Sequence, residues 1–277
     1  MKRFQISLLI CLIVSLGFSV YGQNTKKLII LQTSDVHSRI EPINQRGDRN
    51  YGEGGFVRRA TFLQQFRKEH ENVLLFDCGD ISQGTPYYNM FQGEVEIKLM
   101  NEMGYDAMTI GNHEFDFNVD NMKRLFKMAE FPVVCANYNL DATVLKDVVK
   151  PYVILNKYGL KIGVFGLGAR PEGLIQANKC EGVVYEDPIE VSNKVAALLK
   201  EEEVCDLVIC LSHLGIQMDE RLVAKTRNID VILGGHSHTF MKEPKTYLNM
   251  DGKEVSILHT GKSGVRVGRL DLTLMRK

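Results

Sequence analysis

Short apolar runs alternate with longer amphipathic segments along most of the chain. The runs are rich in Val, Ile and Leu and predict buried strands over residues 28–33, 73–76, 107–110, 133–136, 207–211 and 231–233. The amphipathic segments predict helices over residues 56–69, 94–103, 119–128, 189–201 and 220–226. Strands that alternate with helices are typical of an α/β protein with mixed sheets.

Some apolar runs follow one another without a helix between them. Runs at residues 152–155 and 161–165 flank Asn156-Lys157-Tyr158-Gly159, which predicts a hairpin. Runs at residues 245–248, 255–259 and 266–274 close the chain. Because no helix separates them, we expect these last three runs to form an antiparallel end of the sheet system.

The first residues differ from the rest of the chain. Lys2 and Arg3 precede an apolar stretch over residues 6–20, which is short for a membrane-spanning helix. This pattern predicts a signal peptide over residues 1–22 with cleavage before Gln23, and the alternative is an uncleaved membrane anchor. We therefore expect an exported protein, periplasmic or secreted, whose residues 23–277 form one domain without stable insertion in the membrane.

Charge and cysteine content argue against some functions. The 277 residues contain 34 Lys and Arg and 34 Asp and Glu. Zero net charge without a basic cluster disfavours a nucleic-acid-binding scaffold. The sequence contains no CxxC pair, so cysteine is not the expected metal ligand. Cys135, Cys205 and Cys210 lie in apolar runs and are expected to be buried thiols.

Polar motifs directly follow five of the apolar runs. They are Asp35-Val36-His37, Gly79-Asp80, Gly111-Asn112-His113-Glu114-Phe115-Asp116, Ser212-His213 and Gly234-Gly235-His236-Ser237-His238. In α/β sheets, ligands bind beyond the carboxyl ends of the strands. We therefore expect these motifs to converge on one site.

The spacing within the motifs suggests metal ligands. Asp35 and His37 are two residues apart, and so are His236 and His238. In extended backbone, side chains at this spacing project to the same face, which suits two ligands of one ion. The glycine before Asp80 permits a turn that brings the carboxylate close to a metal.

Side chains near residue 113 suggest roles beside metal binding. The His113 imidazole can face a substrate while Asp116 accepts a hydrogen bond from its other nitrogen. Asn112 offers an amide oxygen as a hard ligand. We interpret Glu114 as a solvated or helix-start carboxylate, and Asp77 as structural because it still belongs to its strand.

The candidate metal ligands are Asp35, His37, Asp80, Asn112, His213, His236 and His238. This mixture of nitrogen and oxygen donors suits Zn, Mn, Fe or Co better than Mg or Ca. The set exceeds what one ion with open positions needs, so two divalent ions are predicted. Such a pair lowers the pKa of bound water and holds substrate oxygens for in-line displacement.

In order and spacing, these motifs resemble those of the calcineurin-like metallophosphoesterases. Within that family they are similar to the catalytic domain of bacterial periplasmic 5′-nucleotidases and UDP-sugar hydrolases. Further matches are Gly54-Gly55 with Arg58, Gly84, Ala136-Asn137 and Gly268-Arg269-Leu270. The resemblance spans residues 28–274 and implies an α/β fold, a four-layer αββα sandwich of two mixed β-sheets.

The resemblance also implies a reaction. One metal would take Asp35, His37, Asp80 and His238, and the other would share Asp80 and take Asn112, His213 and His236. His113, oriented by Asp116, would stabilise the transition state or protonate the leaving oxygen. A metal-bound hydroxide would hydrolyse a phosphate ester, and the expected reaction is the release of phosphate from nucleotides by a 5′-nucleotidase.

Two alternatives stay open. A phosphodiesterase or pyrophosphatase that acts on 2′,3′-cyclic nucleotides or UDP-sugars would use the same dimetal site. A metal- or nucleotide-binding module without catalysis is the alternative of another class. The His113–Asp116 pair argues against such a module, because a passive binder needs no oriented imidazole.

The chain also departs from the family. His238 stands where some nucleotidases carry Asn or Gln, which leaves the metal preference open. Secreted members usually continue into a second domain that stacks the base on aromatic rings, and the sequence offers no candidate stacking pair. We therefore expect a catalytic domain whose nucleotide-specificity domain is absent and is supplied by a separately encoded partner. His259, at a late strand end, is expected to be structural.

Overall fold

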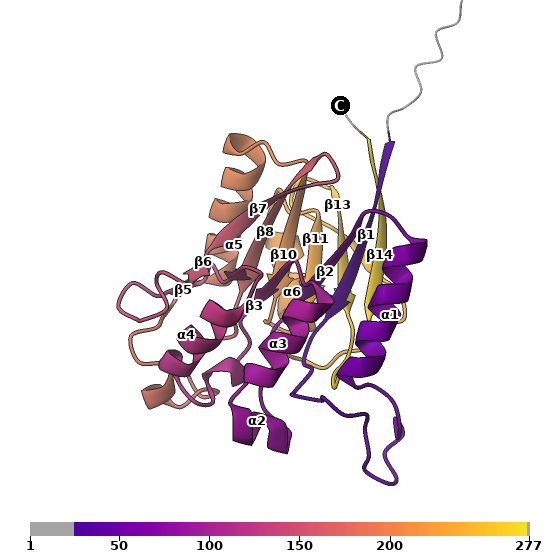
Figure 1. The fold of residues 1–277 in the computed structure, drawn as a ribbon. Coiled ribbons are helices and arrows are strands. Elements are labelled where there is room, and N and C mark those ends of the chain that lie inside the picture. Colours follow the sequence, from indigo (N-terminus) through magenta and orange to yellow (C-terminus); the bar gives the residue numbers. More distant parts are fainter. Residues whose placement is uncertain (1–24, 276–277) are drawn as a thin grey trace, which may run out of the picture.

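Two sheets face each other in the middle of the domain, and helices cover their outer faces (Figure 1). The computed structural model describes residues 25–275, so the predicted signal peptide over residues 1–22 lies outside the described residues. Each of the two sheets has six strands and mixes parallel with antiparallel pairs. The four-layer αββα sandwich implied by the resemblance is confirmed.

The first sheet has the strand order β14-β1-β2-β3-β4-β6. Its strands are β1 (Thr25–Thr33), β2 (Val73–Asp77), β3 (Ala107–Thr109), β4 (Val133–Val134), β6 (Val149–Lys150) and β14 (Gly268–Met275). Neighbouring strands are parallel except β14, which is antiparallel to β1. The helices α1 (Phe56–Glu69), α3 (Glu94–Met103) and α4 (Val119–Met128) pack on its outer face through Leu63, Ile97 and Leu125.

The second sheet has the strand order β12-β13-β11-β10-β8-β7. Its strands are β7 (Tyr152–Lys157), β8 (Leu160–Leu167), β10 (Leu207–Ser212), β11 (Val231–Gly234), β12 (Lys245–Leu248) and β13 (Glu254–His259). The predicted hairpin is confirmed as the antiparallel pair β7–β8. The outer face is covered by α5 (Pro188–Ala197), its π-helical continuation Leu198–Glu202, and α6 (Ile216–Lys225).

Alternation along each central strand separates the layers of apolar side chains. In β1, Leu28 and Ile30 belong to the cluster between the sheets, whereas Leu31 packs against the helices. In β2, Leu74 lies between the sheets and Leu75 faces the helices. Because both faces of these strands are buried, they are continuous apolar runs in the sequence rather than alternating ones.

Local sequence sets the ends of several helices. The helices α1, α3 and α4 have the predicted bounds. Gly93 and Gly104 flank α3 with φ of 92° and 64°, a left-handed conformation that glycine adopts at little cost. Asn118 caps α4 by accepting a hydrogen bond from the Asn121 backbone N–H at 3.0 Å. Helix α6 begins at Ile216, earlier than predicted, directly after the turn at Gly215.

The prediction for the last three apolar runs is wrong in part. β12 and β13 pair antiparallel in the second sheet, but β14 pairs with β1 along eight residues in the first sheet. Leu270, Leu272 and Leu274 on β14 then pack between the sheets. The edge of β1 needs a partner for its backbone N–H and C=O groups, and a hydrophobic pattern does not encode which segment supplies it.

Short elements were not predicted because they show no periodicity. They are α2 (Pro86–Phe91), β5 (Tyr138–Asn139), β6 (Val149–Lys150), β9 (Val184–Tyr185) and the 3₁₀ turns His113–Phe115 and Ala177–Lys179. The predicted strand 133–136 ends at Val134. Cys135, Cys205 and Cys210 are buried free thiols, as expected. Within residues 25–275, no helix is both long and apolar enough to cross a bilayer.

Candidate metal centre

The predicted ligands follow strands of both sheets and meet at one site. In the first sheet β1, β2 and β3 precede Asp35, Asp80 and Asn112, and in the second sheet β10 and β11 precede His213 and His236. The structure forms three groups of carboxylates and imidazoles, and within each group the ligand atoms lie within 4.8 Å of one another. Neither sheet alone carries the whole set, so the packing of the two sheets assembles it.

The backbone at these motifs is not extended, which corrects the argument from residue spacing. Asp35 and His37 have φ of 50° and 49°, and His236 and His238 have φ of 70° and 51°. The chain therefore turns sharply after each strand, and the alternation of a strand does not apply. Left-handed backbone is uncommon outside glycine and is concentrated at functional sites.

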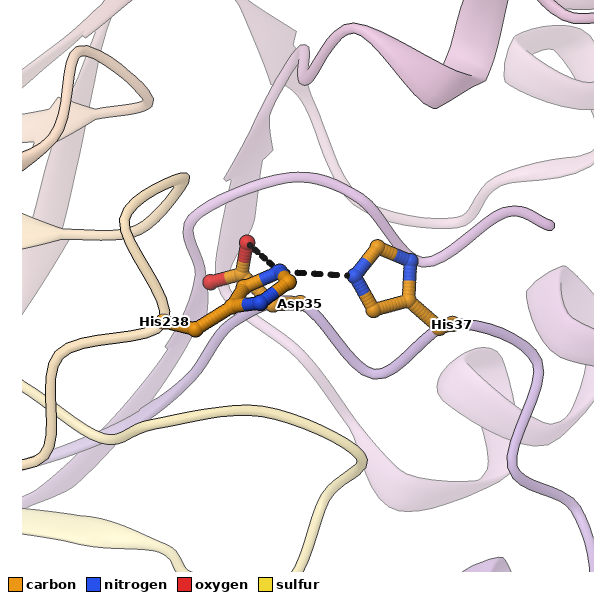
Figure 2. Close-up of side chains that lie close together, drawn as sticks. All are labelled: Asp35, His37 and His238. Carbon is orange, nitrogen blue, oxygen red and sulfur yellow. Dashed lines mark hydrogen bonds and ion pairs between the residues drawn. The ribbon is translucent and has the colours of Figure 1, made fainter. Parts of the chain in front are cut away.

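The first group contains Asp35, His37 and His238 (Figure 2). His37 Nε2 lies 3.0 Å from His238 Nε2, which in turn lies 3.5 Å from Asp35 Oδ1. His37 Nδ1–H donates to the Ser82 carbonyl at 3.3 Å, so its Nε2 lone pair faces His238. Burial lowers the pKa of His37 to about 4, which keeps the imidazole in the neutral form that binds metals.

The second group contains Asp80, His213 and His236. His213 Nδ1–H donates to the Cys78 carbonyl at 2.6 Å, and its Nε2 lies 3.2 Å from Asp80 Oδ2. His236 Nδ1 lies 3.0 Å from Asn112 Oδ1, which brings the amide oxygen to the same place. Although burial opposes a charge on the imidazole, the Asp80 carboxylate raises the pKa of His213 to about 10. A cation at this position would take the place of that proton.

Asp80 belongs to more than one group. It lies with His213 and His236 in one group and with His37 and His113 in another. Its Oδ1 also accepts a hydrogen bond from the His113 backbone N–H at 2.9 Å. One carboxylate thus lies within reach of both clusters of imidazoles, as a bridging ligand must.

His113 lies beside the ligand groups on the 3₁₀ turn His113–Phe115. Its Nδ1 lies 3.2 Å from both carboxylate oxygens of Asp116, and its ring centroid lies 5.5 Å from that of His37. The hydrogen bond to Asp116 raises the pKa of His113. An imidazole with a raised pKa keeps its proton to higher pH, and such a group can act as a general acid.

The family model for the calcineurin-like phosphoesterases matches residues 28–240. This span includes every candidate ligand, from Asp35 to His238. The chain belongs to the calcineurin-like phosphoesterase family.

This phosphoesterase is similar to known 5′-nucleotidases. A snake venom 5′-nucleotidase from Naja atra is 33% identical over 267 residues, which cover 89% of this chain and 50% of the relative. The 5′-nucleotidase of Homo sapiens is 32% identical, with 89% of this chain and 46% of the relative covered. A solved 5′-nucleotidase precursor from Thermus thermophilus has a TM-score of 0.82 at 28% identity, with 90% of this chain and 54% of that chain covered. The chain spans about half the length of the curated relatives it matches.

The donors of the phosphoesterase site fit divalent metal ions. Asp35 and Asp80 are 0% and 2% exposed, and among residues 25–275 their only ion-pair partners are histidines. Burial raises the pKa of Asp35 to about 6, which reflects the cost of a buried carboxylate without a cation. His213 Nε2 is buried, and within residues 25–275 it forms no hydrogen bond of good geometry, although Asp80 Oδ2 lies 3.2 Å away. Nitrogen and oxygen donors in this mixture suit transition-metal ions.

Glu114 lies in the first turn of the 3₁₀ helix His113–Phe115, as the helix-start interpretation expects, but the alternative of a solvated carboxylate is wrong. Glu114 is 1% exposed. Its Oε2 accepts hydrogen bonds from the backbone N–H groups of Asp80 at 2.9 Å and Gly111 at 2.6 Å, and its Oε1 accepts one from Ser82 at 3.2 Å. Glu114 thus ties the loop after β2 to the loop after β3. The sequence carried no signal for this role, because the Asp80 and Ser82 backbone donors are 34 and 32 residues away along the chain.

Asp77 and His259 have structural contacts, as expected. Asp77 accepts hydrogen bonds from Thr33 Oγ1 at 2.6 Å and from the Gly79 backbone N–H at 2.9 Å. His259 Nε2 lies 2.8 Å from Asp219 Oδ2 in a fully buried pair. Within the described residues 25–275, neither of them belongs to a group that could hold an ion.

Proposed function

We propose that this phosphoesterase uses two divalent ions to hydrolyse phosphate esters and that it releases phosphate from nucleotides, as a 5′-nucleotidase does. The observation that carries the proposal is the position of Asp80 within reach of both clusters of imidazoles. The similarity to 5′-nucleotidases supports nucleotides as the substrate class.

In this proposal each ion has its own ligand set. Asp35, His37, Asp80 and His238 would hold one ion, and Asp80, Asn112, His213 and His236 would hold the other. When bound, the ions would supply the positive charge that polarises a phosphoryl group and acidifies a water molecule. The nitrogen-rich donor set favours Zn, Mn, Fe or Co.

His113 and Asp116 would carry the proton chemistry. With Nδ1–H bonded to Asp116, the other nitrogen, Nε2, is left to face the substrate. A proton held at Nε2 would pass to the oxygen of the leaving group as its bond to phosphorus breaks. A phosphodiesterase or a pyrophosphatase would use the same groups, so the leaving group has to be found by experiment.

A substrate panel combined with metal analysis tests the proposal. The purified protein would be freed of metal, reloaded with Mn²⁺ or Zn²⁺, and assayed with AMP, p-nitrophenyl phosphate, bis-p-nitrophenyl phosphate and UDP-glucose. We expect two ions per chain and the highest kcat/KM with AMP. Preference for the bis-ester or UDP-glucose would favour the diesterase or pyrophosphatase. Two bound ions with no turnover of any substrate would indicate a binding module.

We further propose that the chain is exported. The proposal is supported by the apolar segment after Lys2 and Arg3 and by the venom origin named for the Naja atra relative. A mature amino terminus at Gln23 in the secreted fraction is the expected result, and retention of residues 1–22 in the membrane fraction would indicate an anchor. The separately encoded partner stays a prediction, and co-purification from the native host tests it.

A further inference from the structure

A cavity of about 670 Å³ opens beside the metal centre, and His238 forms part of its wall. Phe240, Lys262, Arg49 and Arg266 also line it. Pockets for small-molecule ligands measure about 300–1,000 Å³. A cavity next to His113 measures about 130 Å³. A group the size of a nucleoside therefore fits the cavity beside His238 and does not fit the one beside His113.

Hydrogen bonds connect the segment that lines the larger cavity to the loop that carries Asp35. Phe240 forms an antiparallel bridge with Thr260, whose Oγ1 lies 3.2 Å from Ser34 Oγ. The Ser263 backbone N–H donates to the Asp35 carbonyl at 2.7 Å. These bonds lie on either side of Lys262, so the segment that carries it has a fixed position relative to Asp35.

Positive charge predominates in the cavity. Its charged lining consists of Arg49, Lys262 and Arg266 against Asp48, in addition to His238. Arg266 is paired with Glu53 at 2.8 Å, but within residues 25–275 neither Arg49 nor Lys262 forms an ion pair or a side-chain hydrogen bond. Two cations beside the proposed phosphate site are thus free to bind an anion.

The cavity also presents an aromatic ring. Phe240 is 53% exposed and lines the cavity with its ring. The Arg266 guanidinium lies over the ring, 6.0 Å from its centroid. Nucleic-acid bases stack on such rings without regard to base identity, because every base has a π-face.

We propose that this cavity binds the part of a nucleotide that extends beyond the scissile phosphate, and that it favours substrates with a second phosphate. This inference rests on the proposed function and adds nucleoside polyphosphates, such as diphosphates, as substrates that the site binds better than AMP. Phe240 stacks on the base, and Lys262 and Arg49 bind the phosphate that stays with the nucleoside. Hydrolysis breaks the bond between the terminal phosphorus and the bridging oxygen. The water oxygen leaves in inorganic phosphate, and the bridging oxygen stays with the shortened nucleotide and takes up a proton.

Kinetics on matched substrates tests the assignment. The double variant Lys262→Met/Arg49→Gln should raise the ratio of the KM for ADP to the KM for glycerol 2-phosphate about tenfold, because two charge contacts are lost. Phe240→Leu should raise the KM for both ADP and AMP about fivefold relative to glycerol 2-phosphate, and Phe240→Tyr should restore it. Lys253→Met is the matched control, because Lys253 is exposed and lies between β12 and β13. Unchanged KM ratios in the cavity variants would overturn the assignment.

Binding supplies a readout that does not need turnover. Calorimetry with adenosine 5′-(α,β-methylene)diphosphate and Mn²⁺-loaded protein should show a Kd about tenfold higher in the double variant. If the protein binds this analogue tightly through Lys262 and Arg49 but hydrolyses no substrate, the proposed function is refuted and the assignment of the cavity stands. If the wild type hydrolyses nucleotides but the analogue binds the double variant and the wild type with equal Kd, the assignment of the cavity is refuted and the proposed function stands. Neither binding nor hydrolysis in the wild type would refute both.

Discussion

Glu114 offers the most direct test of how the metal centre is positioned, because it contacts the ligand loops without being a ligand. Its carboxylate accepts hydrogen bonds from the backbone N–H groups of Asp80, Ser82 and Gly111. We consider two substitutions. Glu114→Gln keeps one oxygen, which can still accept from Asp80 and Gly111, but it turns an amide NH₂ toward the Ser82 N–H. Glu114→Ala leaves all these N–H groups without an acceptor.

The magnitude follows from the bonds that are lost. A hydrogen bond to a charged group contributes about 1.5–3 kcal/mol, and a buried donor without a partner costs about 1–3 kcal/mol. Burial and the nearby Asp80 carboxylate raise the pKa of Glu114, so we take the lower end of each range. We expect Glu114→Gln to lower the free energy of unfolding by about 2 kcal/mol and Glu114→Ala by about 4 kcal/mol. Metal affinity should fall about 10–100-fold, as for other groups that orient ligands.

Urea unfolding of the metal-free protein, followed by circular dichroism, measures the first effect. Titration of Zn²⁺ against a competing chelator measures the second. Glu243→Gln is the control, because Glu243 is exposed. If both Glu114 variants unfold at the same urea concentration as the wild type and bind Zn²⁺ equally well, the backbone N–H groups have found other partners, and the reasoning from their hydrogen bonds is wrong.

Three further predictions follow from the site and its surroundings. Removal of divalent ions with a chelator should abolish phosphate release, and Mn²⁺ or Zn²⁺ should restore it. Turnover by protein shown to be metal-free would contradict the role of the metal centre in the reaction. His113→Gln should lower kcat about 10²–10⁴-fold while the metal content per chain stays the same, and a matching loss of metal would make His113 a ligand instead. Burial raises the pKa of Asp77 from 3.8 to about 7, so its contribution to stability is complete below pH 3.8 and is lost as the pH rises through about 7. Urea unfolding of metal-free Asp77→Asn should therefore show a weaker decline in stability over this window than the wild type, and parallel curves would count against a buried carboxyl group with a raised pKa.

The secondary structure of much of the chain could be predicted because its signals are local. α1, α3 and α4 lie where the amphipathic segments predict them. Strands such as β2 and β10 are buried on both faces, which produces the apolar runs that identified them. The position of the polar motifs after these strands could be predicted as well. The carboxyl end of a parallel strand faces the site, so the residues that line the site follow the strand directly.

Other features depended on the tertiary structure. Asp35 and His238 meet because the two sheets pack against each other, and their left-handed backbone replaces the extended geometry assumed from residue spacing. Glu114 is buried only because the loops after β2 and β3 close over it. Likewise, the exposed ring of Phe240 and the cation of Lys262 border one cavity, although no sequence pattern pairs them.

The sequence by itself determined the longer strands, three of the helices and which polar residues end up near strand ends. These follow from hydrophobic periodicity within a few neighbouring residues. Only the tertiary structure decided that β14 joins the first sheet and that Glu114 holds the ligand loops. Those outcomes depend on which distant backbone groups and surfaces meet, and the free energy of such contacts is not encoded in the periodicity of any one segment.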